Sequence, residues 1–161
     1  MKPSVQVLLI TLGFDFYWTL VVLFRQQGEV LWLALALAAC LMLPPVYRFY
    51  SLLLAAAGSL VDALWVMTGL IEFSGSKLLP LWMLALWLMF ASVWIQISRI
   101  TSLPGWLLAG LATLGGPMAY LAGEYLGAMT FLQPTLTVIG WMALGWLTLM
   151  LYFHILIRKI P

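Results

Sequence analysis

The chain has 161 residues, of which 65% are hydrophobic and only 7% are charged. A soluble globular domain carries about a quarter charged residues and, at about 150 residues, buries only about 70% of the surface that its unfolded chain exposes. This composition would leave large apolar patches in water, which excludes an ordinary soluble domain. The mean hydropathy of +1.11 predicts an integral membrane protein surrounded by lipid.

The charged residues are few and scattered. Seven basic and five acidic residues give a net charge of +2, without a basic cluster of the kind that nucleic acids require, so nucleic-acid binding is excluded. The single cysteine, Cys40, excludes an internal disulfide and a multi-cysteine metal site. His154 is the only histidine, and we predict no metal site and no cofactor.

Apolar segments follow one another along the whole chain. A helix that crosses about 30 Å of hydrocarbon needs about 20 mostly apolar residues. We therefore predict an all-α fold, a polytopic transmembrane helical bundle of about six spans with short loops, in one integral membrane domain over residues 1–161. The predicted spans are 4–24, 29–43, 46–72, 78–98, 102–126 and 134–157.

The first two predicted spans are the least regular. The first resembles a signal peptide, but Asp15 lies inside it and no cleavage site follows, so we expect it to be retained. The second, 29–43, reaches only about 22 Å at 1.5 Å per residue, and Pro44-Pro45 ends it. It must stand upright, borrow flanking residues or be partly re-entrant, and whether it crosses fully stays open.

The basic residues predict an orientation. Six spans place both termini on one side, and the positive-inside rule makes the richer side cytoplasmic. That side holds five basic residues: Lys2, Arg48, Arg99, Arg158 and Lys159. The other side holds only Arg25 and Lys77. We predict a multi-pass protein of a bacterial cytoplasmic (inner) membrane with both termini in the cytoplasm.

Small and polar residues recur at helical spacing in the later spans. Membrane helices associate through such residues, so we expect these faces to point inward. In the third span they are Ser51, Ala55, Gly58, Asp62, Trp65, Gly69 and Glu72; in the fifth, Gly105, Ala109, Ala112, Gly116, Ala119 and Gly123; in the sixth, Trp141, Gly145, Thr148 and Tyr152. The face of Gly123 and Gly127 is alternatively a contact for a partner membrane protein or for a second copy.

Span 102–126 also contains Gly115-Gly116-Pro117. Proline inside a helix frees a carbonyl one turn back, and membrane proteins tolerate this where protein or a cavity satisfies the freed group. Two readings stay open. One is a simple proline kink, and the other is a broken helix of the kind that lines ligand sites in transporters.

Two acids lie deep in predicted spans, Asp15 near the middle of the first and Asp62 in the outer half of the third. An ionisable residue in hydrocarbon costs roughly 2.5–3.5 kcal/mol on insertion scales, so each needs an explanation. Asp62 could bind a proton, a cation or an amine, or could fix helix register with a hydrogen bond. Both acids begin an Asp-x-x-Trp pattern, with Trp18 and Trp65, but this is too weak to indicate an internal duplication.

The candidate binding residues combine these features. They are Asp62, Trp65, Glu124, Tyr120, Gly116, Pro117 and Asp15. We identify no catalytic residue, because the sequence contains no G-x-S-x-G, H-E-x-x-H, Walker or dinucleotide-binding pattern. This favours a protein that is not an enzyme and leaves open an intramembrane enzyme with few, dispersed residues.

From about residue 58 a set of residues recurs that is typical of one known family: Asp62, Trp65, Gly69, Phe73, Pro80, Trp82, Leu86-Trp87, Phe90-Ala91, Gly115-Gly116-Pro117, Tyr120, Ala122-Gly123, Leu126-Gly127-Ala128 and Trp146. With these residues the chain resembles an uncharacterised bacterial inner-membrane family, the domain of unknown function 2878. The resemblance covers roughly the last two thirds and is most specific between Gly115 and Ala128. It implies a small multi-pass membrane protein and no particular activity.

Three functions compete at this point. The first is a small transporter or permease-like subunit with Asp62 in an intramembrane polar site. The second is an enzyme acting on a lipid or quinone, with Asp62, Glu124 and Tyr120 converging on a groove that opens to lipid. The third is a membrane assembly or regulatory protein without a ligand. All three include membrane lipids as surroundings.

Overall fold

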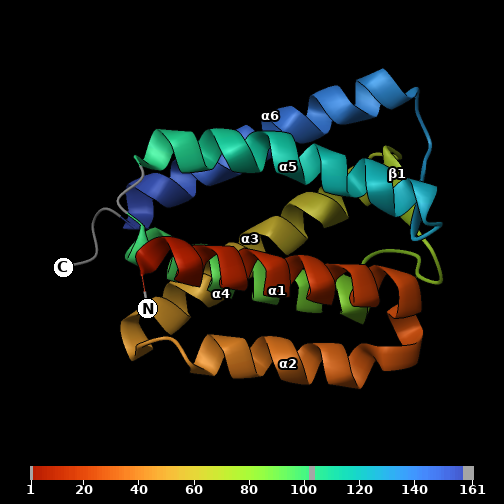
Figure 1. Cartoon of the computed structure of the whole chain (residues 1–161). Coiled ribbons are helices and arrows are strands. Elements are labelled where there is room, and N and C mark those ends of the chain that lie inside the picture. Colours follow the sequence, from red (N-terminus) through yellow and green to blue (C-terminus); the bar gives the residue numbers. More distant parts are fainter. Residues whose placement is uncertain (1, 102–103, 158–161) are drawn as a thin grey trace. The chain divides into compact units, whose positions relative to one another are not determined.

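The computed structural model describes residues 2–101 and 104–157, and its elements are shown in Figure 1. They are α1 (Pro3–Phe24), the 3-10 helix η1 (Arg25–Gly28), α2 (Glu29–Leu41), α3 (Pro45–Met67), β1 (Ile71–Phe73), α4 (Leu81–Ile100), α5 (Gly105–Tyr125), β2 (Met129–Phe131) and α6 (Thr135–Ile157). The chain clusters into two compact units, Met1–Ser59 with Pro80–Ser102, and Leu60–Leu79 with Leu103–Pro161.

The helices confirm the predicted membrane fold, with a small change in the number of spans. Among the described residues, five helical stretches are long and apolar enough to cross a membrane: Pro3–Leu41, Pro45–Met67, Leu81–Ile100, Gly105–Tyr125 and Thr135–Ile157. The first of these contains α1, η1 and α2. Alone, the 13 residues of α2 reach only about 20 Å at 1.5 Å per residue, short of the hydrocarbon core.

In the first unit, α1 and α2 form a hairpin (Figure 1). The buried Tyr17 hydroxyl on α1 donates to the Trp32 carbonyl oxygen on α2 at 2.9 Å, and the two rings meet edge to face at 6.2 Å. The turn is tight because Arg25 takes a left-handed φ of 41° and its carbonyl accepts from the Trp32 indole. These contacts reverse the chain direction, and both α1 and α2 then pack against α4 (Leu81–Ile100).

The break between α2 and α3 is stabilised by an arginine. Pro44-Pro45 cannot continue α2, since proline lacks the amide donor. The Arg48 guanidinium donates to the carbonyls of Leu41 and Leu43, both at 2.7 Å, and so satisfies backbone acceptors that the end of a helix leaves open. The last turn of α2 is thus tied to the first turn of α3.

In the second unit, α3 and α5 end in the same way. The Leu70 amide donates to the Trp65 carbonyl at 2.9 Å around Gly69, whose φ is +69°, and the Ala128 amide donates to the Gly123 carbonyl at 2.8 Å around Gly127, whose φ is +72°. This is the Schellman arrangement, in which a glycine in the left-handed region closes the helix. Each turn leads directly into a strand.

The two strands form a short antiparallel ladder, which the all-α prediction missed. Ile71 pairs with Phe131, Glu72 with Thr130 and Phe73 with Met129. Predicted span 46–72 therefore ends too late, because the Gly69 turn stops α3 at Met67. Glu72 consequently lies exposed on β1 and not on the inward helical stripe that the sequence predicted.

The burial of the other helices tests the predicted inward-facing residues. Ser51, Ala55, Gly58, Asp62 and Trp65 are buried along α3, as predicted. On α6 the prediction was right for Gly145, which faces the Trp65 ring. It was wrong for Thr148, which is exposed, and for Trp141 and Tyr152, which are 57% and 58% exposed. The buried face of α6 carries large side chains, Val138, Met142, Trp146, Leu149, Met150 and Phe153, which pack against the small residues of α5.

Candidate functional site

Asp62 lies in α3 with its side chain 0% exposed. The Tyr120 hydroxyl on α5 donates a hydrogen bond of 2.5 Å to Asp62 Oδ1, and Tyr120 is itself only 3% exposed. Both residues lie about a turn and a half before the end of their helices. The second unit therefore brings together two of the predicted site residues in a short, fully buried hydrogen bond.

Trp65 forms an aromatic wall beside this pair. It lies almost one turn after Asp62, and its ring meets the Tyr120 ring edge to face, with centroids 5.7 Å apart and planes at 89°. Gly145 of α6 lies against the Trp65 ring, because a Cβ added at Gly145 would come within 2.7 Å of it. The absence of a side chain at Gly145 makes room for Trp65 to reach Tyr120.

Gly116 and Pro117 position Tyr120 from one turn below. Gly116 faces the Trp146 ring so closely that any Cβ there would overlap the indole. Pro117 is buried inside α5, which runs without interruption from Gly105 to Tyr125, so the helix is not broken at Gly115-Gly116-Pro117. These residues allow α5 and α6 to approach closely, and no separated half-helices line the site.

Glu124 has a different role from the one considered for an enzyme. Its Oε1 accepts from the Phe131 backbone amide at 3.0 Å and so ties the end of α5 to β2. Gly123 contacts Met129, and the Gly127 carbonyl accepts from Ser74 Oγ at 2.7 Å. The structure gives each of these residues a contact within the second unit.

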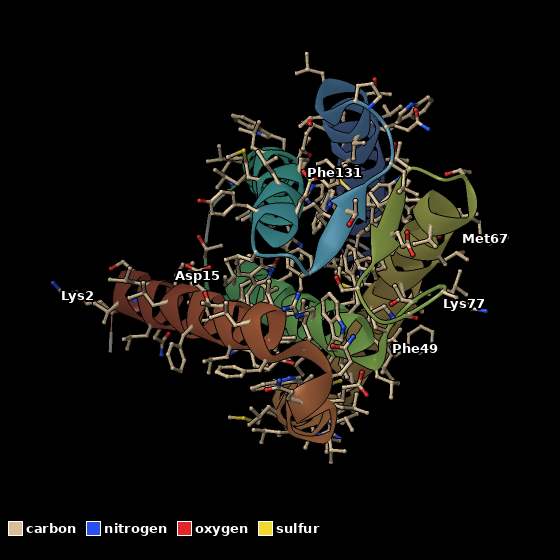
Figure 2. The ribbon with its side chains drawn as sticks, turned by 90° about the vertical axis from the view of Figure 1, so that its right-hand side faces the viewer. Lys2, Asp15, Phe49, Met67, Lys77 and Phe131 are labelled. Carbon is tan, nitrogen blue, oxygen red and sulfur yellow. The ribbon has the colours of Figure 1, made fainter. Side chains whose placement is uncertain are left out.

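Asp15 belongs to the first unit. It lies on α1 (Figure 2), its side chain is exposed, and its backbone carbonyl accepts from Thr19 Oγ1 at 2.8 Å. Asp15 stays a predicted site residue.

The sequence did not place Trp146 on the inward face of α6, although the family resemblance named it. The signal that could have found it is Gly116, because the missing side chain at that position leaves space on α5 that the Trp146 ring fills. Within residues 2–101 and 104–157, no group of three or more His, Cys, Asp or Glu could hold a metal ion.

The arrangement combines a carboxyl group, a phenol and apolar rings inside a membrane span. A carboxyl held this way can exchange a proton or bind a cation. The phenol can donate a hydrogen bond to the carboxyl or to a ligand that takes the place of the carboxyl. The rings of Trp65 and Tyr120, which meet edge to face, give the pair an apolar surrounding.

No curated protein and no solved structure matches the chain. A family model does match, over residues 7–152, and this range includes α1 and α2, where the resemblance seen in the sequence was only general. The match covers most of the chain, which therefore belongs to the family described as Protein of unknown function (DUF2878).

Proposed function

We propose that this multi-pass protein is a small transporter or permease-like subunit in which Asp62 is the intramembrane group that takes up a proton or a cation. The single observation that supports it is the fully buried Asp62 carboxyl, hydrogen-bonded by Tyr120 within a span long and apolar enough for a membrane. Ionisable residues at such positions commonly mark ion pathways and proton relays.

A purely structural role would not require an ionisable side chain at position 62. If Asp62 only accepted a hydrogen bond that fixes the register of α3 and α5, an asparagine of the same size would serve without the cost of an ionisable group in hydrocarbon. Asp62→Asn therefore separates the two roles, because it keeps the acceptor oxygen for Tyr120 and removes the group that exchanges a proton.

The experiment uses the full chain reconstituted in liposomes that contain a fluorescent pH indicator. A potassium diffusion potential, imposed with valinomycin, drives proton entry. In a parallel series the outer solution contains sodium and the liposomes contain a sodium indicator, so that sodium entry is measured instead. We expect the wild type to carry one of the two ions faster than empty liposomes. Asp62→Asn should lower that rate to the level of empty liposomes, because an amide cannot exchange a proton or carry the negative charge that attracts a cation.

The matched control is Glu29→Gln, which makes the same chemical change at the start of α2 and should leave the flux unchanged. Tyr120→Phe should lower the rate by less than Asp62→Asn, because it keeps the carboxyl. Equal flux in the wild type and in Asp62→Asn, with both proteins folded, would refute the proposal.

Two further elements of the proposal concern surroundings. The proposed location is a bacterial inner membrane, and the basic residues support an orientation with Lys2, Arg48 and Arg99 on the cytoplasmic side. Arg158 and Lys159, which contributed to that prediction, lie outside the described residues. Reporter fusions at each terminus test the orientation. A partner helix on the face of Gly123 and Gly127 stays a prediction, tested by cross-linking from an introduced cysteine.

A further inference from the structure

The two partners of the buried hydrogen bond, Asp62 and Tyr120, are 58 positions apart, and this separation recurs through the second unit. It relates Gly69 to Gly127, the two glycines that end α3 and α5, and Phe73 to Phe131, the last residues of β1 and β2. The sequence alone shows little of this, since only scattered positions are identical in the two segments.

The backbone hydrogen bonds repeat at the same separation. Three backbone bonds, each from an amide to a carbonyl, end α3: Thr68 to Leu64, Gly69 to Val66 and Leu70 to Trp65. Three equivalent bonds end α5: Leu126 to Ala122, Gly127 to Glu124 and Ala128 to Gly123. The ladder is extended on both sides by equivalent bonds, from the Ser74 amide to the Ala128 carbonyl at 3.0 Å and from the Leu132 amide to the Leu70 carbonyl at 3.1 Å.

A glycine–tryptophan contact repeats as well. Gly58 of α3 faces the Trp87 ring of α4 within the first unit, and Gly116 of α5 faces the Trp146 ring of α6 within the second. In both cases an added Cβ would overlap the indole. Gly58 and Gly116 again have the separation of Asp62 and Tyr120, and the two tryptophans are one position further apart. The recurrence thus includes the helix that follows each strand.

Equivalent residues meet each other at two places in the second unit. Glu72 pairs with its equivalent Thr130 in the centre of the ladder, and Asp62 bonds its equivalent Tyr120. A two-fold rotation brings a residue next to its own equivalent only near the rotation axis. A local two-fold axis between α3–β1 and α5–β2 therefore passes through the ladder and through the buried pair.

We propose that α3–β1–α4 and α5–β2–α6 are two copies of one helix–strand–helix module, and that the β1–β2 ladder is a gate that closes the Asp62–Tyr120 site on the local axis to water. The inference rests on the proposed function only in treating that pair as a site. Parallel repeats with a shared site between them are a known construction in transporters.

The composition of the ladder suits a gate. Its inward side chains, Ile71, Phe73 and Met129, are buried with Ala128, whereas Glu72 and Thr130 are exposed. Figure 2 shows Phe131 on β2 and Lys77 in the connection that follows β1. With only three residues in each strand, few backbone hydrogen bonds hold the ladder, and the burial of Ile71 and Phe73 keeps it closed most of the time.

The test cross-links the gate and measures whether water-borne reagent reaches Asp62. In a Cys40→Ala background, which leaves no other thiol, Glu72→Cys with Thr130→Cys places two thiols on directly paired residues. The purified full chain in lipid nanodiscs is treated with a water-soluble carbodiimide and glycine ethyl ester, which convert an accessible carboxyl into an amide. Mass spectrometry then reports the modified fraction of Asp62, with Glu29 as internal reference.

We expect slow modification of Asp62 in the reduced protein, a decrease of about tenfold on oxidation, and recovery on reduction, since local opening then requires breaking a covalent link. The matched control is Gly105→Cys with His154→Cys, at the other end of α5, where Gly105 lies against the His154 ring; oxidation there should leave modification of Asp62 unchanged.

Three results would overturn the inference: no disulfide between positions 72 and 130, equal modification of Asp62 in the oxidised and reduced forms, or no modification in either form. These outcomes are independent of the flux experiment. If Asp62→Asn abolished flux while the cross-link had no effect on modification, transport would stand and the gate would be refuted. If flux were unchanged while the cross-link protected Asp62, the gate would stand and transport would be refuted.

Discussion

The hydrogen bond between Tyr120 and Asp62 predicts a defined loss of stability in Tyr120→Phe. The substitution removes one hydroxyl and keeps the ring that packs edge to face on Trp65, so it creates no large cavity. Leaving a buried polar group short of a partner costs about 1–3 kcal/mol in soluble proteins. Interhelical hydrogen bonds in membranes average only about 0.6 kcal/mol and reach about 1.7. The bond here is short and both partners are buried, so we expect a loss of about 1–2 kcal/mol.

A double-mutant cycle with Asp62→Ala separates the hydrogen bond from other effects. Unfolding of each variant is followed by circular dichroism as sodium dodecyl sulfate is added to detergent micelles. We expect the sum of the two single losses of stability to exceed the loss in the double variant by about 1 kcal/mol. Independent sites would instead add within about 0.3–0.5 kcal/mol. Tyr125→Phe is the matched control, because Tyr125 is 92% exposed and should lose nothing. Additive losses in the cycle would refute the reasoning.

The other predictions concern the backbone. Gly116→Ala should lower the midpoint of detergent unfolding, because its Cβ would overlap the Trp146 ring. At Gly115 an added Cβ would have no atom within 4 Å, so Gly115→Ala should be neutral or should stabilise the helix by up to about 1 kcal/mol. Equal effects of the two substitutions would contradict the close contact between Gly116 and Trp146. Gly127→Ala should cost about 1–2 kcal/mol in the same assay, since φ is +72° there. Arg48→Met should increase amide hydrogen exchange at the junction of α2 and α3 by removing both guanidinium bonds, and unchanged exchange would show that they contribute nothing.

The membrane fold could be predicted because it depends on composition and length. Helix ends were placed within a few residues where proline marks them, as at Pro134 before α6. The end of α3 was missed because Ile71, Glu72 and Phe73 continue an apolar pattern, and only the left-handed backbone at Gly69 shows that the helix has stopped. A strand of three residues is too short to produce a recognisable alternation.

The burial of Asp62 and Trp65 followed from their spacing on one helix face, but the contact with Tyr120 depends on how α3 and α5 pack, which spacing on one helix does not contain. The expectation for α6 failed for a related reason. The expected inward face of α6 contained Trp141 and Tyr152, which are exposed, whereas the small face of α5 is filled by the large ring of Trp146 on α6. The Asp-x-x-Trp patterns also concealed the repeat, because the equivalent of Asp62 is a tyrosine.

The short helix α2 has a consequence for the bilayer around it. The polar residues Arg25, Gln26 and Gln27 precede it, and the Arg48 guanidinium is fixed at its last carbonyls, so polar groups mark both ends of an element about 20 Å long. Headgroups that solvate both ends must approach each other more closely there than around α1. Lipids with short acyl chains should accumulate beside α2, and the protein should partition into the thinner regions of a mixed membrane.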